Sequence, residues 1–316
     1  MSLTSFSPST QDAAVSFAKE TGLHDATWQD YVSLLKPRVM VLVVFSGVAG
    51  MVAAMAQQYA NGHAMLHPFI ACVAILSLAV GAGASGAINM WYERDVDAIM
   101  KRTQGRAIPS GKIAPQSALE FASVLMFLSV LMMGVTVNWV AAGLLVFAQW
   151  FYACFYTMFL KRRTSQNIVI GGAAGAFPPL IGWAAVTGNI SIEPIVYFLI
   201  IFLWTPPHFW ALALFSNDDY TKADIPMLPV THGAAHTRLQ MLVYTLVLWP
   251  VSVLPSILGD AGMTYGVGAA VLSGMFTLSA IQVYRLKTER ASRMMFAYSI
   301  LYLFLIFTLV MVDRWL

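Results

Sequence analysis

The feature that most constrains this chain is a series of nine apolar runs along the sequence. Each holds about 20 residues, the length that an α-helix needs to span the hydrocarbon core of a bilayer. The chain has 316 residues, of which 59% are hydrophobic and only 10% are charged, a balance typical of membrane proteins. We therefore predict an all-α polytopic membrane protein with nine transmembrane helices. The predicted spans are 39–58, 68–88, 117–137, 139–160, 168–187, 194–215, 239–258, 263–284 and 294–312.

The positions of the basic residues predict how these helices are oriented. If the N-terminus is cytoplasmic, 17 of the 18 Lys and Arg residues lie on the cytoplasmic side, and only Arg314 lies outside. Lys and Arg are concentrated in the cytoplasmic loops of membrane proteins. We expect a cytoplasmic N-terminus and an external C-terminus. The first 30 residues resemble neither a signal peptide nor a transit peptide, which favours a bacterial inner membrane. The net charge of +3 gives no reason to expect nucleic acid.

Two parts of unequal size are predicted. Residues 1–37 form a cytoplasmic leader, and residues 38–316 form the nine-helix domain. The end of the leader has the pattern of a short amphipathic helix lying on the membrane interface. Its apolar side chains are Trp28, Tyr31, Leu34 and Leu35.

Several residues inside the runs carry structural expectations. Cys72 and Cys154 fall within spans, where two buried thiols are expected rather than a disulfide or a metal site. The pairs Pro178-Pro179 and Pro206-Pro207 remove backbone donors in mid-membrane, so two broken helices beside a substrate chamber are predicted.

The two longest cytoplasmic loops, 89–116 and 216–237, carry most of the unusual polar sequence. They lie four helices apart along the chain. This spacing predicts two four-helix units with a ninth helix appended, and active-site loops on the cytoplasmic side.

The first loop opens with Asn89, Glu93 and Asp97, spaced four residues apart. Residues at this spacing in an α-helix differ by about 40°, so the three side chains share one stripe. Such a stripe suits a divalent cation, although a solvated helix end with ordinary surface acids would give the same pattern. Asp95 is turned about 160° from Glu93 and is expected to meet solvent or a basic neighbour.

The second loop holds Asp218 and Asp219, with Asp224 following. Two facing acidic clusters match magnesium diphosphate chemistry, because Mg²⁺ is usually held by a few carboxylates together with phosphate oxygens of the substrate. Diphosphate bound in this way is a leaving group, and an apolar chamber would hold its organic tail. Bases that could contact phosphate are Arg102, Arg106, Lys161, Arg162 and Arg163.

These loops carry a family resemblance. The stretch NMWYERDVDAIMKRTQGRAIPSG, from Asn89 to Gly111, is similar to the signature of the UbiA-type intramembrane prenyltransferases. Residues 156–188, the stretch WTPPHFWALALF at 204–215 and the stretch DYTKADIPMLPV at 219–230 resemble the haem-farnesylating branch of that family. The resemblance covers nearly the whole chain after about residue 28.

The resemblance implies Mg²⁺-dependent transfer of a farnesyl group from farnesyl diphosphate to a vinyl group of haem b. Water adds a hydroxyl, and the products are haem O and diphosphate, with a haem-modifying enzyme as a possible downstream partner. The implied catalytic residues are Asn89, Glu93, Asp97 and Asp219. The implied metal ligands are Glu93, Asp97, Asp218 and Asp219. The implied substrate-binding residues are Arg38, Arg102, Arg106, Lys161, Asn167 and His208.

Some alternatives stay open at this point. His208 could ligate haem iron or could satisfy backbone groups freed by Pro206 and Pro207, while His232 and His236 are expected to be solvated. Another aromatic or tetrapyrrole acceptor is the nearest rival function. A secondary transporter is a rival of a different class, but its ion site should lie near the midplane, whereas these acids lie at helix ends.

Overall fold

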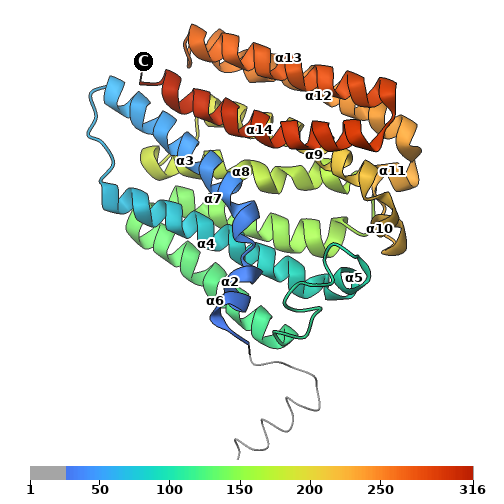
Figure 1. Ribbon diagram of the computed structural model, residues 1–316. Helices are drawn as coiled ribbons and strands as arrows, with labels where there is room; N and C mark the ends of the chain where they lie inside the picture. Colours follow the sequence, from blue (N-terminus) through green and yellow to red (C-terminus); the bar gives the residue numbers. More distant parts are fainter. Residues whose placement is uncertain (1–25, 316) are drawn as a thin grey trace, which may run out of the picture.

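The computed structural model describes residues 26–315, and all regular structure within that range is helical (Figure 1). Nine helices in this range are long and apolar enough to cross a membrane, which confirms the predicted number. Two of them end in π-helical segments, η1 (Met133–Val137) and η2 (Phe151–Leu160). The spans are α3 (Pro37–Ala60), α4 (Pro68–Tyr92), α6 with η1 (Pro115–Val137), α7 with η2 (Trp139–Leu160), α8 (Asn167–Thr187), α9 (Ile192–Phe215), α12 (Gly233–Ile257), α13 (Met263–Leu286) and α14 (Glu289–Asp313).

Short helices mark one end of the bundle. The helices α5 (Arg94–Ile99), α10 (Asn217–Lys222) and α11 (Leu228–Thr231) lie together at the right of Figure 1, and we call this end the loop face. The chain passes from α4 into α5 and from α9 into α10 at this face. The two long polar loops of the sequence are therefore gathered at the same end of the bundle.

The predicted amphipathic helix before the first span is present as α2 (Trp28–Leu34). A capping box between Thr27 and Asp30 starts it. Trp28 is exposed, whereas Leu34 is fully buried against residues of α4 such as Ala87. This contrast is the amphipathic pattern expected from the sequence, while its position on a membrane interface stays a prediction. Residues 1–25 of the predicted leader lie outside the described part of the chain.

The first helices of the two predicted four-helix units, α3 and α8, pack along each other. Glycines allow this close approach. A Cβ atom on Gly182 of α8 would lie 1.9 Å from the carbonyl oxygen of Gly47 on α3, and one on Gly50 would lie 2.2 Å from that of Pro179. Small residues bring helices together in lipid, where tight packing replaces the hydrophobic effect as the source of association.

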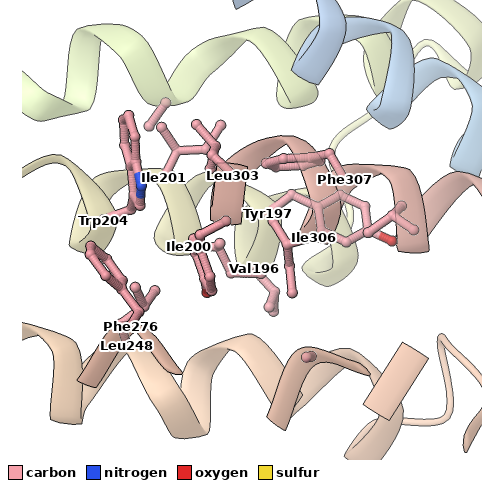
Figure 2. Close-up of a cluster of buried hydrophobic side chains, with 14 of the residues drawn as sticks. Val196, Tyr197, Ile200, Ile201, Trp204, Leu248, Phe276, Leu303, Ile306 and Phe307 are labelled. Atoms are coloured by element: carbon pink, nitrogen blue, oxygen red, sulfur yellow. The ribbon is translucent and has the colours of Figure 1, made fainter. Parts of the chain in front are cut away.

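The ninth span closes the bundle. Helix α14 packs against α13, α9 and also α3, so the last span contacts the first. Figure 2 shows the apolar cluster at this junction, in which Tyr197 and Ile200 of α9 meet Phe307 of α14 and Phe276 of α13. At the end opposite the loop face, Arg314 bonds to the buried carboxylate of Glu193.

The expectation of broken helices is wrong. Helix α8 continues through Pro178-Pro179, and α9 continues through Pro206-Pro207. Two adjacent prolines remove only two neighbouring backbone hydrogen bonds, and the packed helices on either side keep the axis continuous. Both pairs are buried, and Thr205 Oγ1 donates a 2.7 Å hydrogen bond to the carbonyl of Ile201 at the same turn.

The expectation of buried thiols is also wrong. Cys72 and Cys154 are both exposed on the protein surface within their spans, and they are not joined to each other. Their side chains therefore face lipid. A thiol behaves as a small apolar group, so this contact carries no cost in free energy.

Candidate functional site

The first acidic stripe is buried at the loop face. Glu93 follows the last residue of α4 and precedes α5, so it occupies the junction between the two helices. Asn89, Glu93 and Asp97 are only 4%, 1% and 3% exposed. The alternative of a solvated helix end is therefore wrong. Buried carboxylates are expensive unless cations or donors surround them, so their neighbours decide what the site can do.

Glu93 is the centre of a hydrogen-bond network that draws on three segments of the chain. Lys161 Nζ lies 2.5 Å from Glu93 Oε2, which also accepts a 2.8 Å bond from Asn89 Nδ2. The same amide nitrogen lies 3.2 Å from Thr157 Oγ1, and Asn89 Oδ1 accepts a 3.0 Å bond from Lys36 Nζ. We call these five residues the Glu93 network.

Asp97 has its own cation. Arg106 Nη1 donates a 2.7 Å bond to Asp97 Oδ2, and the carboxylate is almost fully shielded while the guanidinium is partly exposed. The segment after α5 folds back to make this contact, because Thr103 Oγ1 donates a 3.0 Å bond to the backbone carbonyl of Asp97. Arg106 therefore lies at the mouth of the site, between the buried acid and solvent.

Lys36 and Thr157 are the two residues of the Glu93 network that the sequence interpretation missed, and Lys36 is the charged one. It caps the start of α3 with a left-handed backbone, φ 50°, which is unfavourable for a lysine. Burial and the nearby charges of Arg106 and Lys161 lower the pKa of Lys36 to about 7, against the opposite effect of the carboxylates. The sequence signal is the Lys36-Pro37-Arg38 entrance to the first span, in which the predicted residue is Arg38. Arg38 is exposed on the first turn of α3, whereas Lys36 joins the network.

The π-helix η2 positions two members of the network. Thr157 lies within it and Lys161 follows it directly, and the backbone N–H of Lys161 bonds five residues back to the carbonyl of Tyr156. π-Helical turns are rare in proteins, and those that occur are often found at functional sites. A ten-residue π segment is not visible in hydrophobic periodicity, so sequence reasoning had no means to place it.

The network fits a divalent cation that is completed by its substrate. Glu93 Oε1 is buried without a hydrogen-bond partner, so one oxygen is left for a ligand. Within residues 26–315, no three acidic, His or Cys side chains lie close enough to hold an ion by themselves. Mg²⁺ does not need such a cage, since one or two carboxylates together with substrate phosphates and water suffice. Glu93 and Asp97 would supply those carboxylates.

The second acidic cluster lies beside this site rather than within it. Asp218 is exposed and Asp219 is half-buried, and both line a separate cavity of about 450 Å³. The two loops nevertheless pack together, because Val96 and Met100 share an apolar cluster with Tyr220. The structure thus brings the loops into contact without bringing all four carboxylates to one ion, and the metal role of Asp218 and Asp219 stays a prediction.

Asn167 ties a third loop to this assembly. Its Nδ2 donates to the backbone carbonyls of Lys161 at 3.1 Å and Pro226 at 3.4 Å, while its Oδ1 is buried without a partner. It is fully buried, whereas Arg102 is exposed in the turn between α5 and Arg106. Both stay predicted substrate-binding residues.

Two other acids are explained without a ligand. Asp95 accepts two bonds from Arg162, at 2.7 and 2.9 Å, which confirms that it meets a basic neighbour. Those bonds lower the pKa of Asp95 below its usual value. Asp224 is exposed with φ 51°, a left-handed conformation that Asp tolerates better than most residues. Neither residue belongs to the Glu93 network.

His208 lies deeper in the bundle than the acids. Its Nδ1 is 2.6 Å from Ser299 Oγ on α14, and its ring stacks between Trp204 and Phe296. The alternative that it satisfies backbone groups freed by the prolines is wrong, because this bond crosses to another helix. Contact of His208 with haem stays a prediction. His232 and His236 are exposed at the start of α12, as expected.

Comparisons with known proteins agree with this geometry. A family profile described as the UbiA prenyltransferase family matches residues 37–307. A "Protoheme IX farnesyltransferase" of Rhodopseudomonas palustris (strain BisB5) is 52% identical over 295 residues, covering 92% of each chain. One of Parvibaculum lavamentivorans is 52% identical over 315 residues, covering 96% of each. A UbiA homologue from Archaeoglobus fulgidus, solved with DMAPP and Mg²⁺, has a TM-score of 0.65 at 15% identity, covering 88% of this chain and 99% of its own.

Proposed function

Because the chain belongs to the UbiA prenyltransferase family, we propose that it transfers the farnesyl group of farnesyl diphosphate to a vinyl group of haem b. The observation that carries this function is 52% identity, over 92% and 96% of the chain, to two curated protohaem IX farnesyltransferases. The products are haem O and diphosphate. No observation favours another aromatic acceptor or a transporter.

The buried charges suit the departure of diphosphate. We infer that Lys36, Arg106 and Lys161 contact phosphate oxygens, with Asn89 holding Lys36 in place. Bound Mg²⁺, held by Glu93 and Asp97, would neutralise the charge that develops on the leaving group. Groups already oriented toward that charge need no reorganisation when the bond breaks, which is the main source of electrostatic catalysis.

The reaction balances with water as the third reactant. The carbon–oxygen bond of farnesyl diphosphate breaks, and diphosphate leaves with the electron pair. The vinyl group of haem b forms a new carbon–carbon bond to the farnesyl carbon. Water adds to the cation left on the acceptor and loses a proton, which gives a hydroxyl group.

The location follows from the same charges. The protein is a multi-pass membrane protein. We propose that the loop face is cytoplasmic in a bacterial inner membrane, because nearly all Lys and Arg residues lie on that side of the spans. Farnesyl diphosphate has a water-soluble anionic head group and an apolar tail. It would then reach the site from the cytoplasmic interface of the membrane. A downstream haem-modifying enzyme is a predicted partner only.

The function is tested by assay of the purified protein with Mg²⁺, farnesyl diphosphate and haem b. Mass spectrometry should show haem that has gained a farnesyl group and a hydroxyl group, and EDTA should abolish this product. A haem pool that stays unmodified, despite normal haem binding and correct folding, would contradict the proposal.

A matched pair of variants tests the metal assignment. Asp97→Asn removes a buried charge of the site and should lower turnover at least 100-fold, a loss of about 3 kcal/mol of transition-state stabilisation. Asp95→Asn removes an exposed acid two residues away and should leave the rate within a factor of two. Equal rates for both variants would show that Asp97 holds no metal.

A further inference from the structure

The cavity beside the Glu93 network is lined by bases from separate parts of the chain. It has a volume of about 450 Å³ and lies at the loop face, between α10, the start of α12 and the turn from α13 to α14. Its bases are Lys101, Lys222, Arg238 and Lys287. Among the described residues, none of the four has an acidic partner within salt-bridge distance, and Arg238 Nε is buried without any hydrogen bond.

The charges of the lining leave an excess of two positive charges. The acids that line the cavity are Asp218, Asp219 and Glu289. Glu289 is already paired with Arg293, so two unpaired acids face four unpaired bases. Four minus two gives a net charge of +2 around a cavity open to solvent. Such a site attracts an anion that carries two negative charges.

Lys287 is held in the cavity wall at a cost in backbone energy. It ends α13 with φ 56°, a left-handed conformation that favours glycine. Lys36 of the Glu93 network has the same unusual conformation. The left-handed backbone caps the helix, because the N–H of Lys287 donates a 3.2 Å bond to the carbonyl of Val283. Glycine would cap the helix equally well, so the lysine side chain in the cavity wall is not required by the cap.

An aromatic column leads from the cavity into the bundle. Phe215 lines the cavity, and its ring lies 5.8 Å from that of Phe296. The ring of Phe296 lies 4.6 Å from His208, which in turn lies 4.3 Å from Trp204. A ligand with anionic groups at one edge and a flat apolar body would meet the bases and the ring of Phe215 in the cavity, and the other three rings lie behind Phe215.

We propose that this cavity binds the two carboxylates of the acceptor, and that Arg238 and Lys287 are its specificity-determining contacts. The inference rests on the proposed function, since haem b is a flat tetrapyrrole with two propionates. No base of the cavity lining belongs to the Glu93 network, so the carboxylates and the diphosphate would contact separate sets of bases. The acceptor is thereby kept from competing for the diphosphate site. The predicted metal ligands Asp218 and Asp219 also line this cavity.

Charge-removing variants and a blocked substrate test this assignment together. Arg238→Gln and Lys287→Gln should each raise the KM for haem b about tenfold, the effect of losing one charge-assisted hydrogen bond, and leave the KM for farnesyl diphosphate unchanged. Haem b dimethyl ester should be a poorer acceptor for the unaltered protein, and its KM should not change further in the variants. Arg290→Gln, an exposed base outside the cavity, is the matched control and should change neither KM.

The possible outcomes separate this inference from the proposed function. If the unaltered protein forms no farnesylated haem, the proposed function is contradicted, and the carboxylate site that rests on it is contradicted as well. If product forms but both variants keep the KM for haem b, the carboxylate site is overturned. A rise in the KM for farnesyl diphosphate instead would assign these bases to diphosphate and would equally overturn it.

The variant Lys287→Gly separates the loss of the ammonium group from a change in the stability of the fold. Glycine suits the left-handed backbone, so this variant should be at least as thermostable as the unaltered protein in detergent. It should still raise the KM for haem b about tenfold, because the ammonium group is gone. A stable Lys287→Gly protein with an unchanged KM for haem b would contradict the proposal.

Discussion

At the scale of single residues, the site depends on buried charges that neutralise one another. Glu93 is shielded from solvent and contacts Lys161, while Lys36 reaches the same group of atoms through Asn89. Removing one partner of such a group leaves the other charge buried and uncompensated, which costs more than the pair itself contributes. Variants in this network therefore need readouts that separate folding from turnover.

Removing the charge of Lys161 alone, and then of Lys161 and Glu93 together, separates the effect on folding from the effect on turnover. Lys161→Met should lower turnover at least 100-fold and also destabilise the fold by about 3 kcal/mol, because Glu93 loses its cation. The double variant Lys161→Met with Glu93→Gln should recover much of the stability without recovering turnover. Thermal unfolding in detergent and the rate of haem farnesylation measure the two effects. Recovery of the rate in the double variant would show that the pair has no catalytic role.

The lowered pKa of Lys36 predicts that the KM for farnesyl diphosphate depends on pH. Its pKa is lowered to about 7, so the side chain is charged at pH 6 and largely neutral at pH 8. Loss of the positive charge weakens the binding of an anion, so the KM for farnesyl diphosphate should rise as pH increases through 7. Lys36→Arg keeps the charge across this range and should flatten the profile. An equally steep profile in Lys36→Arg would assign the pH dependence to another group.

At the scale of elements, the contact between α3 and α8 sets how closely the two halves of the chain approach. Gly182→Ala would place a methyl group against the backbone carbonyl of Gly47, with no flexible side chain to yield. We expect a loss of about 1 to 3 kcal/mol of stability, seen as a lower unfolding temperature in detergent. Gly175→Ala on the same helix, where nothing lies within 4 Å, is the control and should be neutral or stabilising. Equal changes in the stability of the two variants would show that helix propensity, and not close packing at Gly182, determines the effect.

The elements also show how far sequence reasoning reaches. Length and hydropathy predicted all nine spans, because lipid requires every backbone group to be satisfied within a helix. The spacing of Asn89, Glu93 and Asp97 predicted that they share a face, and all three are buried together. The continuity of the proline-containing helices and the π-helix η2 depend on packing between distant segments, which no local pattern records. Lys36 was missed for the same reason, since the packing of α2 against α4 brings it to Asn89.

At the scale of the whole molecule, the loop face and the opposite end have different tasks. The loop face holds the charges for chemistry, whereas the opposite end holds a buried ion pair that fastens α14 to α9. Arg314→Met should destabilise the protein by about 3 kcal/mol, because Glu193 would stay buried beside Tyr197 without a cation. The exposed pair of Arg293 and Glu289 is the contrast, and Arg293→Ala should cost less than 1 kcal/mol. Unfolding in detergent checks both values, and equal losses would contradict the assigned burial.

The closure of the bundle by α14 has a consequence for how the protein is made. Helix α14 is the last of the nine described spans to leave the ribosome, yet it contacts α3, the first of them. Throughout synthesis the first eight spans must wait in the bilayer with Glu193 lacking its arginine and one flank of α3 facing lipid. The bundle can be completed only after α14 has entered the membrane. A protein that lacks Arg314 would leave the carboxylate of Glu193 buried without its cation.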